Sequence, residues 1–162
     1  MQEIPINEAW RRYNPERVVL VVSRDKTKAN IMPADWCMRC SFIPQLVAVS
    51  IGKTRYTHEI LSSTEEFVIA IPNKQLISVI KFSGSCSGRK IDKFKEAKIE
   101  TEKAEKIKIP LIKKATINFE CKKHSTFDSG GHTIFIGEIL AAHYNKKGIL
   151  FNLKNGTFKE FK

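Results

Sequence analysis

A cluster of cations, hydroxyls and a histidine follows an apolar run in the first third of the chain. It reads Gly52-Lys53-Thr54-Arg55-Tyr56-Thr57-His58 and stands just ahead of an apolar helical pattern. A helix N-terminus offers unpaired N–H groups and a partial positive charge, and arginine makes bidentate contacts with oxyanions. The cluster therefore predicts a phosphate site, with Lys53, Arg55 and Thr57 as ligands and Ser50 and Tyr56 as further contacts. The alternative is a solvated helix start that Thr57 caps.

The cluster needs a rigid support, and the apolar run before it supplies one. Residues Leu46 to Ile51 (LVAVSI) are rich in β-branched side chains and lie between Pro44 and Gly52, which is typical of a core strand. Further strands are predicted at residues 17–23, 29–32, 66–71, 115–122, 132–144 and 149–153, and helices at 57–64, 74–82 and 90–97. Residues 1–16 are expected to form a short helix or arm packed on the body. Short, closely spaced strands with helices between them favour an antiparallel barrel.

Three separated motifs carry a resemblance to a known family. The first contains NIMPADW at residues 30–36, followed by SF-x-P-x-LVAVS-x-GK-x-RYTHE at residues 41–59. The second is GSCSGRKIDKF at residues 84–94, and the third is GHTIFIGE at residues 131–138. Together, and in this order, they resemble the flavin reductase-like family of FMN-binding split-barrel proteins, which includes flavoredoxins and flavin:NAD(P)H reductases.

The resemblance implies a fold, a cofactor and an assembly. The expected fold is mainly β with inserted helices, an antiparallel Greek-key split β-barrel, formed by residues 1–162 as a single domain. The expected cofactor is FMN, and the expected assembly is a homodimer with the flavin near the subunit interface.

The resemblance also implies contacts for the flavin. For the ring it points to the first motif, where backbone N–H groups would bond the carbonyl and N5 edge: Asn30, Met32, Ala34, Asp35 and Trp36. Ser87 of the second motif is a further contact, and Phe161 is expected to cover the flavin of its own or the partner subunit. Without a flavin, Trp36 would be a core or interface aromatic and Asn30 would cap a turn.

Two charged or titratable residues of the later motifs are candidates for tuning the flavin. A cation beside the N1 edge of the ring favours the anionic reduced flavin, and Lys93 is implied in that position. The competing interpretation is an ion pair of Lys93 with Asp92 or Glu96. His132 is implied beside the ring or the phosphate, but Gly131 replaces the aspartate that precedes this histidine in the family pattern, so an orienting carboxylate is absent.

The four cysteines do not form a metal-binding pattern. Cys37 and Cys40 make one C-x-x-C pair, whereas Cys86 and Cys121 stand alone, so the second ligand pair of a structural zinc site is missing. No secretory signal favours disulfides, and we expect reduced thiols. The C-x-x-C pair could exchange electrons with the flavin or a disulfide partner if the pKa of a thiol were depressed, for example by Arg39. The alternative is a position that merely tolerates small residues.

Composition narrows the function classes. The net charge of +11 permits nucleic acid, an anionic surface or an anionic cofactor. Lysines mixed with glutamates, and aromatics at 9% without basic and aromatic alternation, argue against nucleic acid. No run approaches the roughly 18 apolar residues of a membrane helix, and no signal peptide stands at the N-terminus, so we expect a cytoplasmic protein without a membrane partner.

These observations favour an FMN-dependent oxidoreductase. It would pass electrons from a reduced nicotinamide or a protein donor through FMN to a flavin, ferric iron or a redox protein. The chain has no G-x-G-x-x-G signal, so a nicotinamide would have to stack transiently on the exposed flavin face. Two rivals remain open: a flavoredoxin-like carrier without NAD(P)H turnover, and a basic binding module without flavin.

Overall fold

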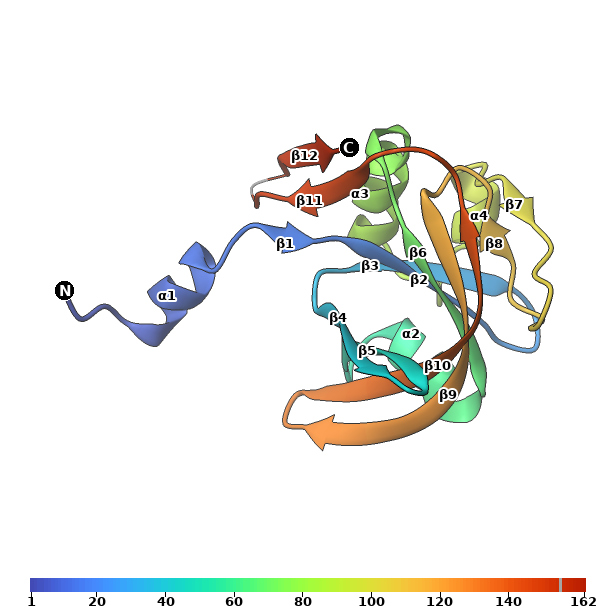
Figure 1. The fold of residues 1–162 in the computed structure, drawn as a ribbon, viewed down its shortest axis with the longest axis horizontal. Helices are drawn as coiled ribbons and strands as arrows, with labels where there is room; N and C mark the ends of the chain where they lie inside the picture. Colours follow the sequence, from blue (N-terminus) through green and yellow to red (C-terminus); the bar gives the residue numbers. More distant parts are fainter. Residues whose placement is uncertain (155) are drawn as a thin grey trace.

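Seven antiparallel strands form one strongly curved sheet in the computed structural model, which describes residues 1–154 and 156–162 (Figure 1). Their order in the sheet is β3-β2-β6-β9-β10-β5-β4. The strands are β2 (Val19–Arg24), β3 (Ala29–Ala34), β4 (Cys37–Phe42), β5 (Gln45–Gly52), β6 (Glu66–Ile71), β9 (Ile117–Ser129) and β10 (His132–Tyr144). Edge strand β3 also contacts β5, so the sheet closes into a split barrel. The predicted fold class is confirmed.

Smaller elements surround this barrel. The strands β1 (Glu16–Arg17), β11 (Ile149–Asn152) and β12 (Phe158–Phe161) make a second sheet, and β7 (Thr101–Glu102) pairs with β8 (Leu111–Ile112). The helices are α1 (Ile6–Arg12), α2 (Tyr56–Ser63), η1 (Lys74–Leu76), α3 (Ile77–Ser85) and α4 (Lys93–Glu96). In the described part of the chain, none of them combines the length and apolarity that spanning a bilayer requires.

The sheet separates two apolar cores. One lies between strands β2 and β6 and the helices η1 and α3, and it includes Leu20, Val68 and Ile112. The other fills the barrel and packs Leu61 of α2 against Phe67 and Phe135. Alternate residues of β2 and β6 therefore face different cores, which explains why residues 67–71 of the strand predicted at 66–71 are all apolar.

The first motif and the residues around it are more strand than the predicted strand at residues 29–32. Residues 29–34 form β3 and residues 37–42 form β4, so only the two residues between them leave the sheet. Both strands are sheet edges, where a proline such as Pro33 removes no ladder hydrogen bond. The proline and the polar residues of this stretch concealed the strand pattern.

Two helix starts also differ from the sequence prediction. Arg55, not Thr57, occupies the N-cap position of α2, and Thr57 is buried in its first turn. The helix predicted at residues 90–97 begins only at Lys93, because the Asp92 carboxylate accepts hydrogen bonds from the backbone N–H groups of Phe94 and Lys95 and caps it there.

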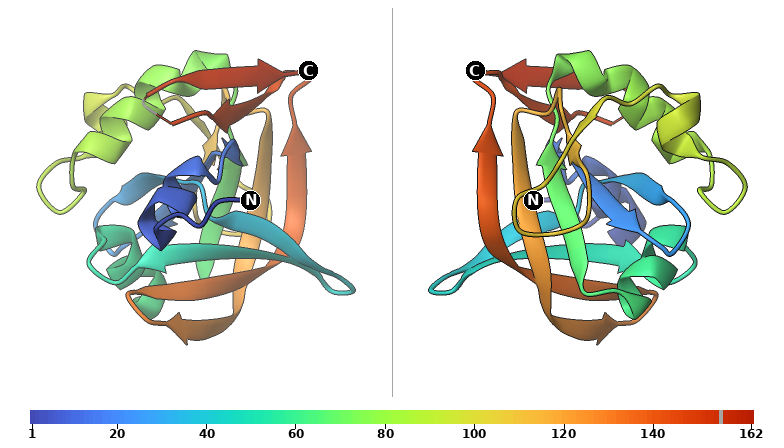
Figure 2. Two further views of the ribbon diagram at one scale, coloured as in Figure 1. Left: turned by 90° about the vertical axis from the view of Figure 1, so that its left-hand side faces the viewer. Right: turned by 90° about the vertical axis from the view of Figure 1, so that its right-hand side faces the viewer.

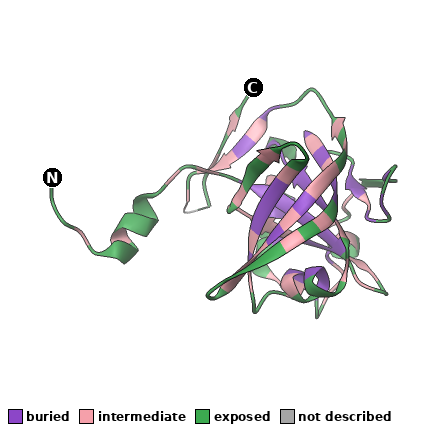
Figure 3. Ribbon diagram, turned by 60° about the horizontal axis from the view of Figure 1, so that its bottom comes forward, coloured by how far each residue is buried: buried purple, intermediate pink, exposed green. Residues whose placement is uncertain are grey.

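The N-terminal helix is present where it was expected, but it does not pack on the barrel. It buries no residue and projects from the body (Figures 1 and 3). Its aromatic contact with the barrel joins the rings of Trp10 and Trp36, whose centroids lie 6.0 Å apart.

Candidate functional site

A pocket of about 730 Å³ opens between β3, the start of α2 and the segment that joins α3 to α4. This volume falls within the range of roughly 300–1,000 Å³ that is usual for small-molecule sites. All residues proposed from the sequence line it except Lys53 and Phe161: Asn30, Met32, Ala34, Asp35, Trp36, Ser50, Arg55, Tyr56, Thr57, Ser87, Lys93 and His132. The structure thus brings the three motifs together at one place.

Strand β3 forms one wall of the pocket. Asn30, Met32 and Ala34 alternate along it, so their side chains share one face. Asn30 is 2% exposed, and its Nδ2 donates a hydrogen bond to Oγ1 of Thr57 at 2.9 Å. Among the residues that the structure describes, its buried Oδ1 has no hydrogen-bond partner. A buried acceptor left without a donor costs free energy.

The loop after α3 approaches this wall very closely. A Cβ atom at Gly88 would lie 2.1 Å from Oδ1 of Asn30 and 3.0 Å from Cδ1 of Tyr56. Only glycine allows such an approach. The loop carries Ser87 and Arg89 into the lining, so Gly88 sets the shape of the pocket.

Lys93 places a buried cation in the pocket. It is 4% exposed, and its Nζ donates hydrogen bonds to the backbone oxygens of Ile31 at 3.0 Å and Ser83 at 2.6 Å. No carboxylate in the described part of the chain makes an ion pair with it, so the alternative pair with Asp92 or Glu96 is wrong. Burial, with the nearby charge of Arg55, lowers the pKa of Lys93.

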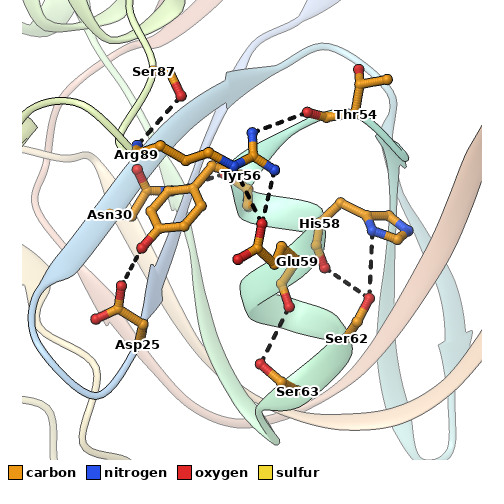
Figure 4. A network of polar contacts seen from close by, with 11 residues as sticks. Asp25, Asn30, Thr54, Tyr56, His58, Glu59, Ser62, Ser63, Ser87 and Arg89 are labelled. Atoms are coloured by element: carbon orange, nitrogen blue, oxygen red, sulfur yellow. Dashed lines mark hydrogen bonds and ion pairs between the residues drawn. The ribbon is translucent and has the colours of Figure 1, made fainter.

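Tyr56 and Arg89 form a polar network at the α2 end of the pocket (Figure 4). The Arg89 guanidinium lies 5.4 Å from the Tyr56 ring centroid and pairs with the Glu59 carboxylate at 2.8 Å. The Tyr56 hydroxyl donates a hydrogen bond to the Asp25 carboxylate. Tyr56 therefore presents its ring, rather than a free hydroxyl, to the pocket.

The hydrogen bond between Tyr56 and Asp25 also shifts the pKa values of both groups. The hydrogen bond to Asp25, with burial, raises the pKa of Tyr56 to about 12. Burial alone would raise the pKa of Asp25, but hydrogen bonds from Tyr56, Lys28 and Thr27 outweigh it and hold that pKa well below its usual range. Asp25 therefore stays ionised and Tyr56 neutral at physiological pH.

Trp36 and His132 stand together in the lining, with ring centroids 4.9 Å apart. His132 begins β10 opposite Gly52 of β5, so the strand pairing delivers it to the pocket. Trp36 supplies the flat aromatic surface here and is 46% exposed, which excludes a core role within this chain.

Two proposed residues lie elsewhere. Asp128 lies on the β9–β10 hairpin, and its carboxylate pairs with the Lys53 ammonium at 2.5 Å. Phe161 packs edge-on against Phe151 in the second sheet, with ring centroids 5.2 Å apart. Sequence reasoning did not name Arg89 and Cys86, which line the pocket, although both stand inside the second motif.

The cysteines give no support to a thiol redox centre. Burial raises the pKa of Cys37 to about 12, and the positive charge that partly opposes this belongs to Arg17 rather than Arg39. All four cysteines are free thiols. Within residues 1–154 and 156–162, no three histidine, cysteine or acidic side chains are grouped as metal ligands.

Comparison with known proteins places this pocket in a family context. An uncharacterised protein of Archaeoglobus fulgidus is 40% identical over 126 residues, covering 78% of this chain and 71% of the relative. The solved flavoredoxin of Methanosarcina acetivorans superposes with a TM-score of 0.85 at 25% identity, covering 100% of this chain and 92% of its own. The NADH:FAD oxidoreductase of Streptomyces globisporus C-1027 gives 0.88 at 22% identity, with 100% and 98% covered.

The sequence model described as flavin reductase like domain matches residues 10–161. That match takes in all three motifs and every residue of the pocket lining. The chain therefore belongs to the flavin reductase-like family, and its fold is the split barrel of that family's flavoredoxins and flavin reductases.

Proposed function

We propose that residues 1–162 form one FMN-binding domain that works as a flavin reductase-like oxidoreductase. Electrons would pass from a reduced nicotinamide or a redox protein to the bound flavin and then to an acceptor. FMN supplies the redox chemistry when bound, and this chain supplies binding, orientation and electrostatics.

The single observation that carries the proposal is the buried ammonium of Lys93. An isolated buried cation is costly, and no carboxylate in the described chain compensates this one. An anionic ligand group beside it would.

The two ends of the pocket support one orientation of the flavin. The N-terminus of α2 would hold the phosphate, with Thr57 in its first turn and with Arg55 exposed and paired with no carboxylate of residues 1–154 and 156–162. Lys53 could join them only by leaving Asp128. The pyrimidine edge would lie on β3 near Lys93, and Trp36 and His132 would border the ring.

An absorbance spectrum of the purified protein, taken before and after FMN addition and gel filtration, tests the cofactor. We expect flavin bands near one FMN per chain. A protein that remains colourless at micromolar FMN would instead be the flavin-free basic module.

A second function is favoured by the likeness to a flavoredoxin. In that case the chain binds FMN but oxidises NAD(P)H negligibly. Steady-state NADH and NADPH oxidation, with free FMN or ferric iron as the acceptor, separates the two. FAD should be tested beside FMN because the S. globisporus relative is an NADH:FAD oxidoreductase.

We also propose a cytoplasmic homodimer. Large apolar side chains stand exposed on α1 and on the β4–β5 hairpin, including Trp10 at 58%, Phe42 at 81% and Ile43 at 94%. Such a patch is typical of a protein interface. The cytoplasmic location is supported by the free cysteines, because thiols stay reduced in such a compartment. Phe161 lies away from the pocket of its own chain, so it would have to reach the partner's flavin. Sedimentation analysis would show the dimer, and monomers at micromolar concentration would contradict it.

A further inference from the structure

We propose that the basic surface beside the α2 end of the pocket is the docking site for a small acidic electron-carrier protein. This inference rests on the proposed function, since it names the protein partner of the same flavin site. The surface, called here the basic rim, consists of residues 24–28, 53–56 and 87–91.

Contacts in the structure join the three segments of the basic rim. The carboxylate of Asp25 accepts a hydrogen bond from Tyr56, and Lys28 Nζ donates one to the backbone oxygen of Ile91 at 3.1 Å. Arg89 Nη1 donates to the backbone oxygen of Thr54 at 3.3 Å. Both views in Figure 2 show the β2–β3 turn, α2 and the α3–α4 segment on the same side of the molecule.

The basic rim concentrates positive charge. Its segments contain seven cations and one carboxylate: Arg24, Lys26, Lys28, Lys53, Arg55, Arg89 and Lys90 against Asp25. Glu59 and Asp128 from outside the rim pair with Arg89 and Lys53. Within the described chain, the other five cations have no ion-pair partner. Even with those two acids counted, the local charge is 7 − 3 = +4.

A flavin phosphate does not account for this charge. Only Arg55 and Arg89 of these cations line the pocket, whereas Arg24, Lys26 and Lys90 are exposed outside it. A molecule held in the pocket would not cover the outer cations, but the surface of a macromolecule would. Clustered charge of one sign also speeds the diffusional encounter with an oppositely charged partner.

An acidic protein fits this surface better than a nucleic acid does. Tyr56 is the only aromatic residue of the rim, and Arg89 already lies over its ring. Bases therefore find no free stacking platform on the rim. A one-electron carrier docked here would lose one electron per encounter. Two encounters would supply the two electrons of full flavin reduction, with the protons coming from solvent.

The test compares two charge-reversal variants of equal net charge. Lys26→Glu/Lys90→Glu alters the basic rim outside the pocket, and Lys103→Glu/Lys146→Glu changes two exposed lysines elsewhere. The probe is reduced rubredoxin, a small acidic iron protein, mixed anaerobically with the FMN-loaded protein in a stopped-flow instrument. We expect the second-order rate of flavin reduction at low salt to fall about tenfold or more in the rim variant and less than twofold in the control.

Salt and binding experiments complete the test. The wild-type rate should fall steeply with ionic strength, and that of the rim variant should hardly change. Equal slowing by both variants, a rate independent of salt, or rim-dependent binding of oligo(U) RNA without any of rubredoxin would overturn the proposal. If the wild type takes up no FMN, the proposed function fails. Isothermal titration of the flavin-free protein with rubredoxin then still tests docking, and absence of binding sensitive to the rim variant would overturn it.

Discussion

At the scale of single residues, the pocket depends on a few groups whose partners are only partly supplied by the chain. Lys93 and Asn30 are both almost fully buried, yet within the described chain the first has no carboxylate partner and the second leaves an oxygen without a hydrogen bond. Such groups cost stability, and an anionic ligand group beside Lys93 would offset part of that cost. The same feature gives the clearest predictions for substitutions.

Removing the Lys93 charge should make the flavin harder to reduce. In Lys93→Met the ammonium that favours the anionic reduced flavin is lost, while the length of the side chain is kept. A loss of about 1.4 kcal/mol corresponds to roughly 30 mV for a two-electron couple, so we expect a midpoint potential more negative by at least that amount. Dye-equilibrated spectroelectrochemistry measures it, and Lys95→Met on the exposed side of α4 is the matched control. An unchanged potential in both would remove Lys93 from the flavin edge.

Arg55 should contribute mainly to affinity. Charge-assisted hydrogen bonds to an oxyanion contribute about 1.5–3 kcal/mol, so Arg55→Ala should raise the FMN dissociation constant by about 10- to 100-fold. Fluorescence titration gives the constant, and Lys146→Ala serves as a control that also removes one exposed cation. If both variants bind FMN like the wild type, the phosphate does not lie at the start of α2.

At the scale of elements, the site is set by how closely the loop after α3 approaches β3. The fold prediction was reliable for elements with a clear period: β6 and β10 have the predicted bounds, and β5 exceeds its prediction by one residue at each end. It failed for β3 beyond residue 32 and for β4, because edge strands lack the apolar pattern of central ones. The close approach at Gly88 is a tertiary feature, and no local pattern reveals it.

Gly88→Ala should therefore disturb the pocket without unfolding the barrel. The added methyl would collide with Asn30, so the loop must move away and carry Ser87 and Arg89 with it. We expect FMN binding at least tenfold weaker, with a nearly unchanged far-ultraviolet circular dichroism spectrum. Gly131→Ala, where a Cβ meets no atom within 4 Å, should bind normally. Equal affinity of both variants would show that the loop tolerates the shift.

A buried carboxylate holds the segment between β7 and β8 against β9. Glu120 of β9 is 0% exposed and accepts backbone hydrogen bonds from Glu105 at 2.9 Å and Lys106 at 2.7 Å, and His143 Nε2 lies 2.7 Å away. Glu120→Gln places an amide N–H₂ where N–H donors converge. We expect a loss of about 2–3 kcal/mol in the free energy of unfolding by urea, against little change for the exposed Glu102→Gln.

The same carboxylate gives the stability a defined pH dependence. Burial opposes ionisation of Glu120, but hydrogen bonds from the Glu105 and Lys106 backbones and from His143 outweigh it and lower its pKa. A folded-state pKa below the unfolded value means that its contribution is present above the unfolded pKa and is lost as the pH falls through the folded pKa. Urea unfolding between pH 7 and pH 3 should show this loss in the wild type and a weaker one in Glu120→Gln. If the unfolding free energies of the two proteins fell in parallel with pH, Glu120 would not be the source of this pH dependence.

At the scale of the whole molecule, three motifs separated in sequence converge because the barrel brings edge strand β3 near β5 and sets α2 and the α3–α4 segment beside them. Motif order identified the family and most of the lining. It could not separate Lys53 and Phe161 from the pocket, since the ion pair of Lys53 with Asp128 of β9 and the contact of Phe161 in another sheet depend on tertiary packing. The clustering of charge into the basic rim likewise becomes visible only in the fold.

The most direct test of the central claim is a crystal structure of the protein with FMN. The account predicts the phosphate at the N-terminus of α2 within hydrogen-bond distance of Arg55, and the pyrimidine edge of the ring along β3 beside Lys93. A flavin in the reverse orientation, or one bound outside this pocket, would contradict it.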